Sequence, residues 1–204
     1  MKRSFFARDA VTLARELLGT HLVHEIEGSV RIGRIVETEA YCGPDDAACH
    51  ARFGRTERTR ALFGPPGHAY VFLIYGMYDC FNVVGLAEGQ GHAVLVRAVE
   101  PVFGIAGRTD GPGRLTRAMG LSRAHNGIGL QRGPVRIEPG TAPVRTAITA
   151  RVGVAYAGDD ADLPYRFVDA GSAHVSRPAA RLIGRPSSTP PAGSARSPLR
   201  RSPR

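Results

Sequence analysis

The sequence predicts a single α+β domain in which helices surround a curved antiparallel β-sheet. Strand-like segments follow one another closely between residues 20 and 99, as in an antiparallel meander and unlike a parallel α/β sheet. Helical periodicity lies on either side of this region. The 204 residues, of which 43 % are apolar, are enough for one domain with a sizeable core.

The first predicted element is a helix that begins after Asp9, which can cap it, and stops at Gly19. Strands are expected on both sides of a turn at Glu27-Gly28, and Tyr75-Gly76-Met77 is expected at the tip of a hairpin. The predicted strands cover residues 20–25, 29–41, 69–74, 78–84, 93–99, 151–155 and 165–168, and a short helix covers 114–119. The long irregular stretch 42–68 is of the kind that often carries function.

The chain is predicted to consist of one folded domain, residues 1–184, and a disordered tail, residues 185–204, rich in Arg, Ser and Pro. The formal net charge of +9 favours polyanionic partners, with nucleic acid first and a membrane surface second. Five of the Arg residues lie in the tail, so the domain itself is only mildly basic, near +4.

Several classes of protein are excluded by composition. No apolar run reaches 18 residues, so no membrane span is expected, and the N-terminus is interrupted by charge too early for a signal peptide. Three Cys residues do not suit a disulfide framework. We therefore expect a cytoplasmic protein, nucleoid-associated if it is bacterial, and a monomer by default.

Glu37 and Glu39 are candidates for chemistry because they lie two residues apart, just before a Gly-Pro break. In a regular strand they share one face with Ile35 and Tyr41, and a bulge would change this. The alternative interpretation of spacing alone is a solvated strand face. Cys42, Cys49 and His50 lack the paired close ligands of structural zinc sites, so no metal is predicted.

Arg97 and Tyr75 are unusual for their positions. A charge inside the apolar strand around Arg97 needs a partner, for which Glu39 and Glu100 are candidates. Tyr75 at a hairpin tip has little core to enter. It either folds back on the protein or acts as a wedge between base pairs.

Beyond these features, long segments of the chain resemble the alkyladenine DNA glycosylases, also called 3-methyladenine DNA glycosylases. The segments occur in the order found in the family, between about residue 5 and about residue 178. They are FFARDAVTLARELLG near the N-terminus, VETEAY at 36–41, GPDDAACH at 43–50, YVFLIYGMYDCFN at 70–82, VLVRAVEP at 94–101, GPGRLTRAMG at 111–120, RVGVAYAG at 151–158 and LPYRFV at 163–168.

The resemblance implies base-excision repair of double-stranded DNA without a metal or cofactor. Its substrates are expected to be damaged purines: 3-methyladenine, 7-methylguanine, hypoxanthine and ethenoadenine. Glu39 occupies the position of the base that activates water, and Arg97 and the backbone carbonyl of Val152 occupy positions that help to place that water.

The resemblance also implies how a flipped base is held. Tyr41, His50 and Phe72 match the walls that stack on the base, and the backbone amide of His50 is expected to donate to it. Asn82 matches a residue thought to reject guanine. Tyr75 matches the intercalating residue.

The chain departs from the family at two places. Some relatives carry Tyr where Phe72 stands. Only nine residues, 102–110, connect two matched segments where relatives have a longer basic helical stretch, so a weaker grip on DNA is expected. Lys2 is the sole lysine, which favours a water-driven, monofunctional reaction without lyase activity. The alternatives are a damage binder without turnover, and an unrelated enzyme that uses Glu37 and Glu39 on a nucleoside or sugar.

Overall fold

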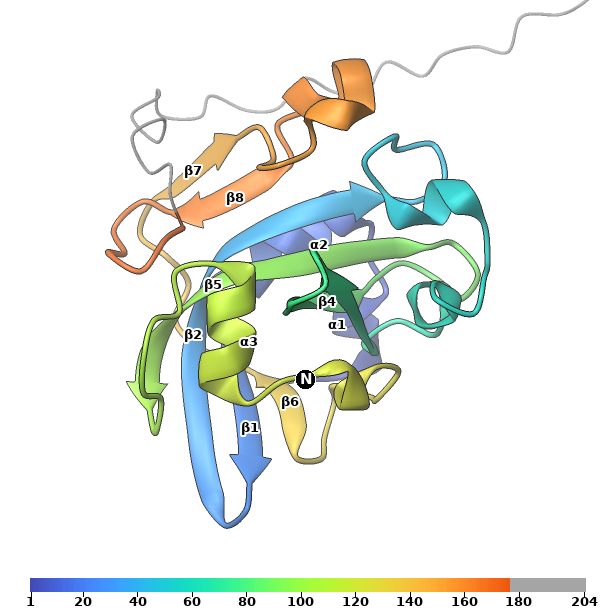
Figure 1. The fold of residues 1–204 in the computed structure, drawn as a ribbon. Helices are drawn as coiled ribbons and strands as arrows, with labels where there is room; N and C mark the ends of the chain where they lie inside the picture. The colour runs from blue at the N-terminus through green and yellow to red at the C-terminus, as the bar shows by residue number, and fades with distance from the viewer. Residues whose placement is uncertain (177–204) are drawn as a thin grey trace, which may run out of the picture.

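The structure of the chain is a computed structural model, and it describes residues 1–176 (Figure 1). The helices are α1 (Arg3–Phe6), α2 (Ala10–Leu17) and α3 (Pro112–Met119), with 3-10 helices η1 (His50–Phe53), η2 (Arg60–Phe63), η3 (Arg123–His125) and η4 (Ala155–Asp162). The strands are β1 (His21–Ile26), β2 (Ser29–Cys42), β3 (Ala69–Ile74), β4 (Tyr78–Val84), β5 (His92–Phe103), β6 (Val135–Glu138), β7 (Thr146–Thr149) and β8 (Arg166–Asp169).

All strands belong to one antiparallel sheet, which curls around the core with the helices against it (Figure 1). Its order is β3-β4-β5-β2-β1-β6, and β8 joins β2 and carries β7. The predicted α+β class with a curved antiparallel sheet is therefore confirmed.

Strand β2 is the axis of this sheet. Along one edge it pairs with β5 from Ile32 to Cys42. Along the other edge it pairs first with β1 and then with β8, which takes over from Glu37 to Glu39. A segment near the C-terminal end of the described chain is thereby brought beside the two candidate carboxylates.

A pair of bulges decides which side chains of β2 share a face. The register between β2 and β5 shifts between Ile35 and Glu37, and again between Glu37 and Thr38. Ile35 consequently lies in the main core, where Thr38 donates to the carbonyl of Ala14 in α2 at 2.8 Å. The strand is therefore not the regular one in which Ile35 would share the face of Glu37, because the extra residue inverts the alternation at this point.

Helices α2 and α3 form in the way their sequences predict. The Asp9 side chain accepts a hydrogen bond from the amide of Thr12 at 2.9 Å and caps α2, whose apolar residues are buried. Helix α3 ends at Gly120 in a left-handed conformation. Gly113 in its first turn lies so close to Tyr78 that a Cβ would come within 2.7 Å of the ring. The start of α3 is thus fitted directly against β4.

One predicted strand is wrong, and several short elements were not predicted. Residues 151–155 form no strand; they run as a loop into η4, because their polar groups bind other parts of the chain. Elements α1, β6 and β7 have too few residues for a periodic pattern. Residues 102 and 103 extend β5, and the rest of the short 102–110 segment leads to α3.

The predicted domain boundary at residue 184 and the tail 185–204 lie outside the described residues. Within residues 1–176, no helix has the length and apolar character needed to cross a membrane.

Candidate active site

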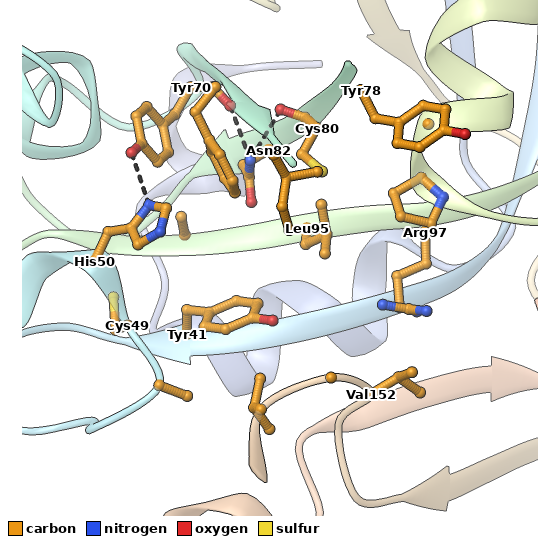
Figure 2. A pocket seen from close by; sticks show the side chains of 18 of the residues that line it. Tyr41, Cys49, His50, Tyr70, Tyr78, Cys80, Asn82, Leu95, Arg97 and Val152 are labelled. Carbon is orange, nitrogen blue, oxygen red and sulfur yellow. Dashed lines mark hydrogen bonds between the residues drawn. The ribbon is translucent and has the colours of Figure 1, made fainter. Parts of the chain in front are cut away.

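A cavity of about 800 Å³ opens on the face of the sheet that carries Tyr41. Its walls come from β2, β3, β4 and β5, from η1, from the start of α3 and from the 152–156 loop. Figure 2 shows His50 and Tyr70 at the left of this cavity, and Tyr78, Arg97 and Val152 at the right. A cavity of this size lies in the range of small-molecule sites and exceeds what one flat ring fills.

Glu39 lies directly behind the wall of this cavity. Its side chain is completely buried and is held by three groups that line the cavity. Oε1 accepts a hydrogen bond from the amide of Val152 at 2.7 Å. Oε2 accepts from the hydroxyl of Tyr41 at 3.0 Å and from Nη1 of Arg97 at 3.2 Å. A buried carboxylate with a guanidinium and two further donors is stabilised as an anion.

Arg97 is placed by the bulge in β5, where Ala98 pairs with Glu37 and Val96 pairs with Thr38. Its Nε donates to Glu37 at 2.7 Å, and its Nη2 donates to Ser176 at 3.2 Å. Burial alone would lower the pKa of Arg97, but the charges of Glu39 and Glu37 outweigh burial and raise it. The guanidinium is therefore a fixed cation. Its predicted partner Glu39 is found, whereas Glu100 binds Arg34 instead.

Glu37 is completely buried, and both of its carboxylate oxygens accept hydrogen bonds from other parts of the protein. Its oxygens accept from Arg97, from Nε of Arg166 at 2.7 Å, and from both the amide and the hydroxyl of Ser176 at 2.6 and 2.7 Å. Neither carboxylate lines the cavity itself, but Glu39 binds three residues that do, whereas Glu37 binds only Arg97 among them. Glu37 therefore differs from Glu39 in its surroundings and holds Arg97 in place.

Tyr41 has two functions in the wall. Burial and the negative charge of Glu39 raise its pKa well above 10, so its hydroxyl remains a donor. The guanidinium of Arg151 lies 4.9 Å from the ring centroid, and Arg151 makes a bidentate ion pair with Asp46 at 2.6 and 2.9 Å. The hydroxyl of Tyr41 is therefore held by Glu39, and one face of its ring packs against Arg151.

Across the cavity, His50, Tyr70 and Phe72 form an aromatic wall. Nδ1 of His50 is hydrogen-bonded to the Tyr70 hydroxyl at 3.0 Å, and its ring centroid is 4.5 Å from that of Phe72 (Figure 2). Burial, aided by the charges of Arg58 and Arg52, lowers the pKa of His50. At neutral pH the wall is therefore uncharged and apolar.

Asn82 supplies a polar group at the end of this wall. Its amide nitrogen donates to the carbonyls of Tyr70 and Cys80 at 2.9 and 3.3 Å, which fixes the side-chain orientation. Figure 2 shows the oxygen on the side away from these bonds. Cys49 and Cys80 also line the cavity, and burial raises the pKa of each thiol to about 11, so neither is a thiolate at neutral pH.

Tyr75 lies at the mouth of the cavity, at the tip of the β3–β4 hairpin as predicted. Its backbone adopts a positive φ of 52°, and 78 % of its surface is exposed. Bulky residues rarely adopt this conformation. The hairpin thus projects a large ring into solvent instead of folding it back onto the protein.

The structure brings the predicted residues together in one place. Seven of them line the cavity: Tyr41, His50, Phe72, Tyr75, Asn82, Arg97 and Val152. Three of these seven, Tyr41, Arg97 and Val152, bind Glu39. Val152 contacts Glu39 through its amide, and the expected role of its carbonyl in placing the water stays a prediction.

Sequence reasoning missed the residues that hold this arrangement, namely Asp46, Arg151, Arg166 and Ser176. Asp46 and Arg151 are more than 100 residues apart in the sequence, and so are Glu37 and Ser176. The available signal was weak: Arg151 and Arg166 stand beside apolar residues, as Arg97 does. Among residues 1–176, no group of three or more His, Cys, Asp or Glu is placed to bind a metal ion.

Comparison with known proteins identifies the family. The family model described as methylpurine-DNA glycosylase matches residues 4–173. A protein of Myxococcus xanthus is 55 % identical over 181 residues, covering 87 % of this chain and 93 % of the relative. One from Anaeromyxobacter dehalogenans is 52 % identical over 88 % of this chain and 87 % of its own length.

A third relative, from Legionella pneumophila, is 46 % identical over 87 % of this chain and 98 % of its own length. All three carry the name "Putative 3-methyladenine DNA glycosylase". The match extends through every element that builds the cavity. The chain belongs to the methylpurine-DNA glycosylase family and is a DNA glycosylase of base-excision repair.

Proposed function

We propose that this protein hydrolyses the N-glycosidic bond of alkylated and deaminated purines in double-stranded DNA, with a flipped base in the cavity and Glu39 activating water. The observation that carries this proposal is the position of the Glu39 carboxylate. It lies directly behind an aromatic cavity, and the groups that hold it line that cavity.

The hydrogen bonds of Glu39 leave one acceptor site of the carboxylate for a water. A carboxylate has about four lone-pair sites, and three of them are taken by Val152, Tyr41 and Arg97. The fourth is on Oε1, beside the Val152 amide. Because Glu39 has no exposed surface, binding of the substrate has to shift a neighbouring group slightly before water reaches this site.

The chemistry then follows from charge. Cleavage builds positive charge on the sugar, and an anion behind the wall stabilises that charge and accepts a proton from the attacking water. Flat neutral walls at Tyr41, His50 and Phe72 attract a cationic methylated purine by cation–π interaction. The Asn82 side chain, fixed by its two hydrogen bonds, would reject guanine by a steric clash with the exocyclic amine.

The reaction is proposed to be monofunctional and carried out by a monomer. Glycosylases that also cut DNA commonly form a Schiff base through an amine. Lys2 precedes α1, and no lysine lines the cavity. Water is therefore the available nucleophile.

A base-release assay tests this function on duplexes with 3-methyladenine, 7-methylguanine, hypoxanthine or ethenoadenine. Free base in solution, with no covalent adduct after borohydride reduction, is the expected result. Binding without release would show a damage binder, activity on free nucleosides would show a different enzyme, and a trapped adduct would overturn the monofunctional mechanism.

Replacing Tyr75 by Ala is expected to weaken extrusion of the base, since the side chain would fill the gap in the helix. Stacking of a ring contributes about 1–3 kcal/mol, so kcat/KM should fall at least about fivefold. Tyr75→Phe keeps the ring and should retain most of the activity. Because 78 % of Tyr75 is exposed, stability should be unchanged, and a stable but fully active Tyr75→Ala enzyme would refute the wedge.

A further inference from the structure

A second group of aromatic side chains lies at the mouth of the cavity, outside the aromatic wall described above. Phe53 ends η1 and Tyr156 lies in η4, and their surfaces are 63 % and 60 % exposed. Both line the same cavity as His50. Single exposed apolar residues need no explanation, but two large rings at one cavity mouth call for a ligand.

These two rings both contact Arg52. The guanidinium carbon of Arg52 lies 4.4 Å from the Phe53 ring centroid and 5.3 Å from that of Tyr156. Arg52 also donates to the carbonyl of Ala47 at 2.5 Å, and the Tyr156 hydroxyl donates to the carbonyl of Ala48 at 3.1 Å. Contacts that already restrict a ring reduce the conformational entropy it loses when a ligand stacks on it.

The backbone of η1 relates this outer cluster to the inner wall. In a 3-10 helix the side chains at i and i+3 lie on the same side, separated by roughly 6 Å along the axis. His50 and Phe53 stand in this relation at the two ends of η1. A ring that moved from Phe53 to His50 would therefore travel along one side of one short helix into the inner cavity.

We propose that Phe53, Arg52 and Tyr156 form an outer stacking subsite for the extruded nucleobase before it enters the inner cavity. Aromatic rings with an arginine are the surface on which single-stranded nucleic acids stack bases, and such stacking tolerates any base. The inference rests on the proposed function, in which Tyr75 keeps the neighbouring bases stacked, so the extruded base is the one free to reach this rim.

The consequence is that recognition has two stages. The outer subsite accepts an extruded base without regard to damage, because stacking has little sequence preference. The inner cavity, with Asn82 and the Tyr41–Phe72 walls, then admits or rejects it. Stabilising the base at the rim lowers the barrier to entry and leaves the bond-breaking step unchanged.

Photo-crosslinking with 5-iodouracil, which attaches to aromatic side chains that it stacks on, tests which base occupies the subsite. In one duplex the 5-iodouracil is mispaired and easily extruded. In a second duplex it is paired with adenine beside a tetrahydrofuran abasic analogue, and in a third it lies opposite that analogue. We expect mass spectrometry to find a cross-link to Phe53 or Tyr156 only with the mispaired base. A cross-link only from the neighbouring or opposite base, or none at these residues, would overturn the proposal.

The kinetics of base release provide a second test of the outer subsite. Phe53→Leu and Tyr156→Leu should lower kcat/KM at least about fivefold, while the single-turnover rate at saturating enzyme stays within about twofold of the wild type. Phe53→Tyr and Tyr156→Phe keep the rings and should act as the wild type. Leu variants with unchanged kcat/KM, or with a loss in the single-turnover rate, would contradict an entry subsite. Failure of the proposed function is recognised separately, because the wild type itself would then release no base.

Discussion

Replacing Glu39 by Gln is expected to reduce base release by at least about a hundredfold while leaving affinity for damaged duplex DNA nearly unchanged. The amide has almost the shape of the carboxylate, so the cavity keeps its form. It has neither the charge that stabilises the sugar cation nor the basicity to accept a proton from water. Because Glu39 itself lines none of the cavity, the groups that would contact the base remain in place.

The substitution also disturbs Arg97 and Tyr41, which both donate to Glu39 Oε2, so stability has to be measured alongside activity. Urea unfolding of Glu39→Gln separates a folded, inactive enzyme from an unfolded one. Glu100→Gln is the matched control, because Glu100 is a partly exposed carboxylate on β5 that pairs with Arg34. It should retain full activity. A folded Glu39→Gln protein that releases base within tenfold of the wild-type rate would refute the assigned mechanism.

The order of strands and the two main helices could be predicted because local patterns fix them. Alternating or continuous apolar residues marked β1 to β5, and Asp9 with its helical spacing marked α2. Gly76 and the adjacent aromatics marked the hairpin tip, where the positive φ of Tyr75 is observed. These signals need only a few neighbouring residues.

The bulges and the closing contacts could not be predicted, because they depend on residues distant in sequence. The pattern of β2 alone is compatible with a regular strand, and only its pairing with β5 shows that Val36 and Arg97 are extra residues in the register. The 151–155 segment looked like a strand because its apolar residues alternate, yet Arg151 binds Asp46 and the Val152 amide binds Glu39. Tertiary contacts overrode the local preference.

The same limitation explains why Glu37 and Glu39 looked equivalent in the sequence. Both are buried on one face of β2, and they differ only in what surrounds them. Glu39 receives its partners from the cavity wall. Glu37 receives its partners from Arg166 and Ser176, whose positions depend on β8 pairing with β2.

Replacing Glu37 by Ala is expected to lower the free energy of unfolding by about 3–5 kcal/mol, because it leaves the buried guanidinium groups of Arg97 and Arg166 without their shared carboxylate. Domains of this kind are stable by about 5–15 kcal/mol in total, so the variant should unfold at a much lower urea concentration. Removing one partner of a buried ion pair costs far more than the pair itself contributes, since the remaining charge stays desolvated.

Glu57→Ala is the matched control for this experiment. Glu57 pairs with Arg60 at 3.1 Å on the surface, where both side chains are mostly exposed, so its loss should change stability by less than about 1 kcal/mol. A Glu37→Ala protein that is as stable as Glu57→Ala would show that Glu37 is not an anchor. If the variant folds at low temperature, its residual base release should also be reduced, because Arg97 would lose the partner that holds its Nε while Nη1 contacts Glu39. We therefore expect Glu37 to support catalysis through Arg97 without contacting the substrate.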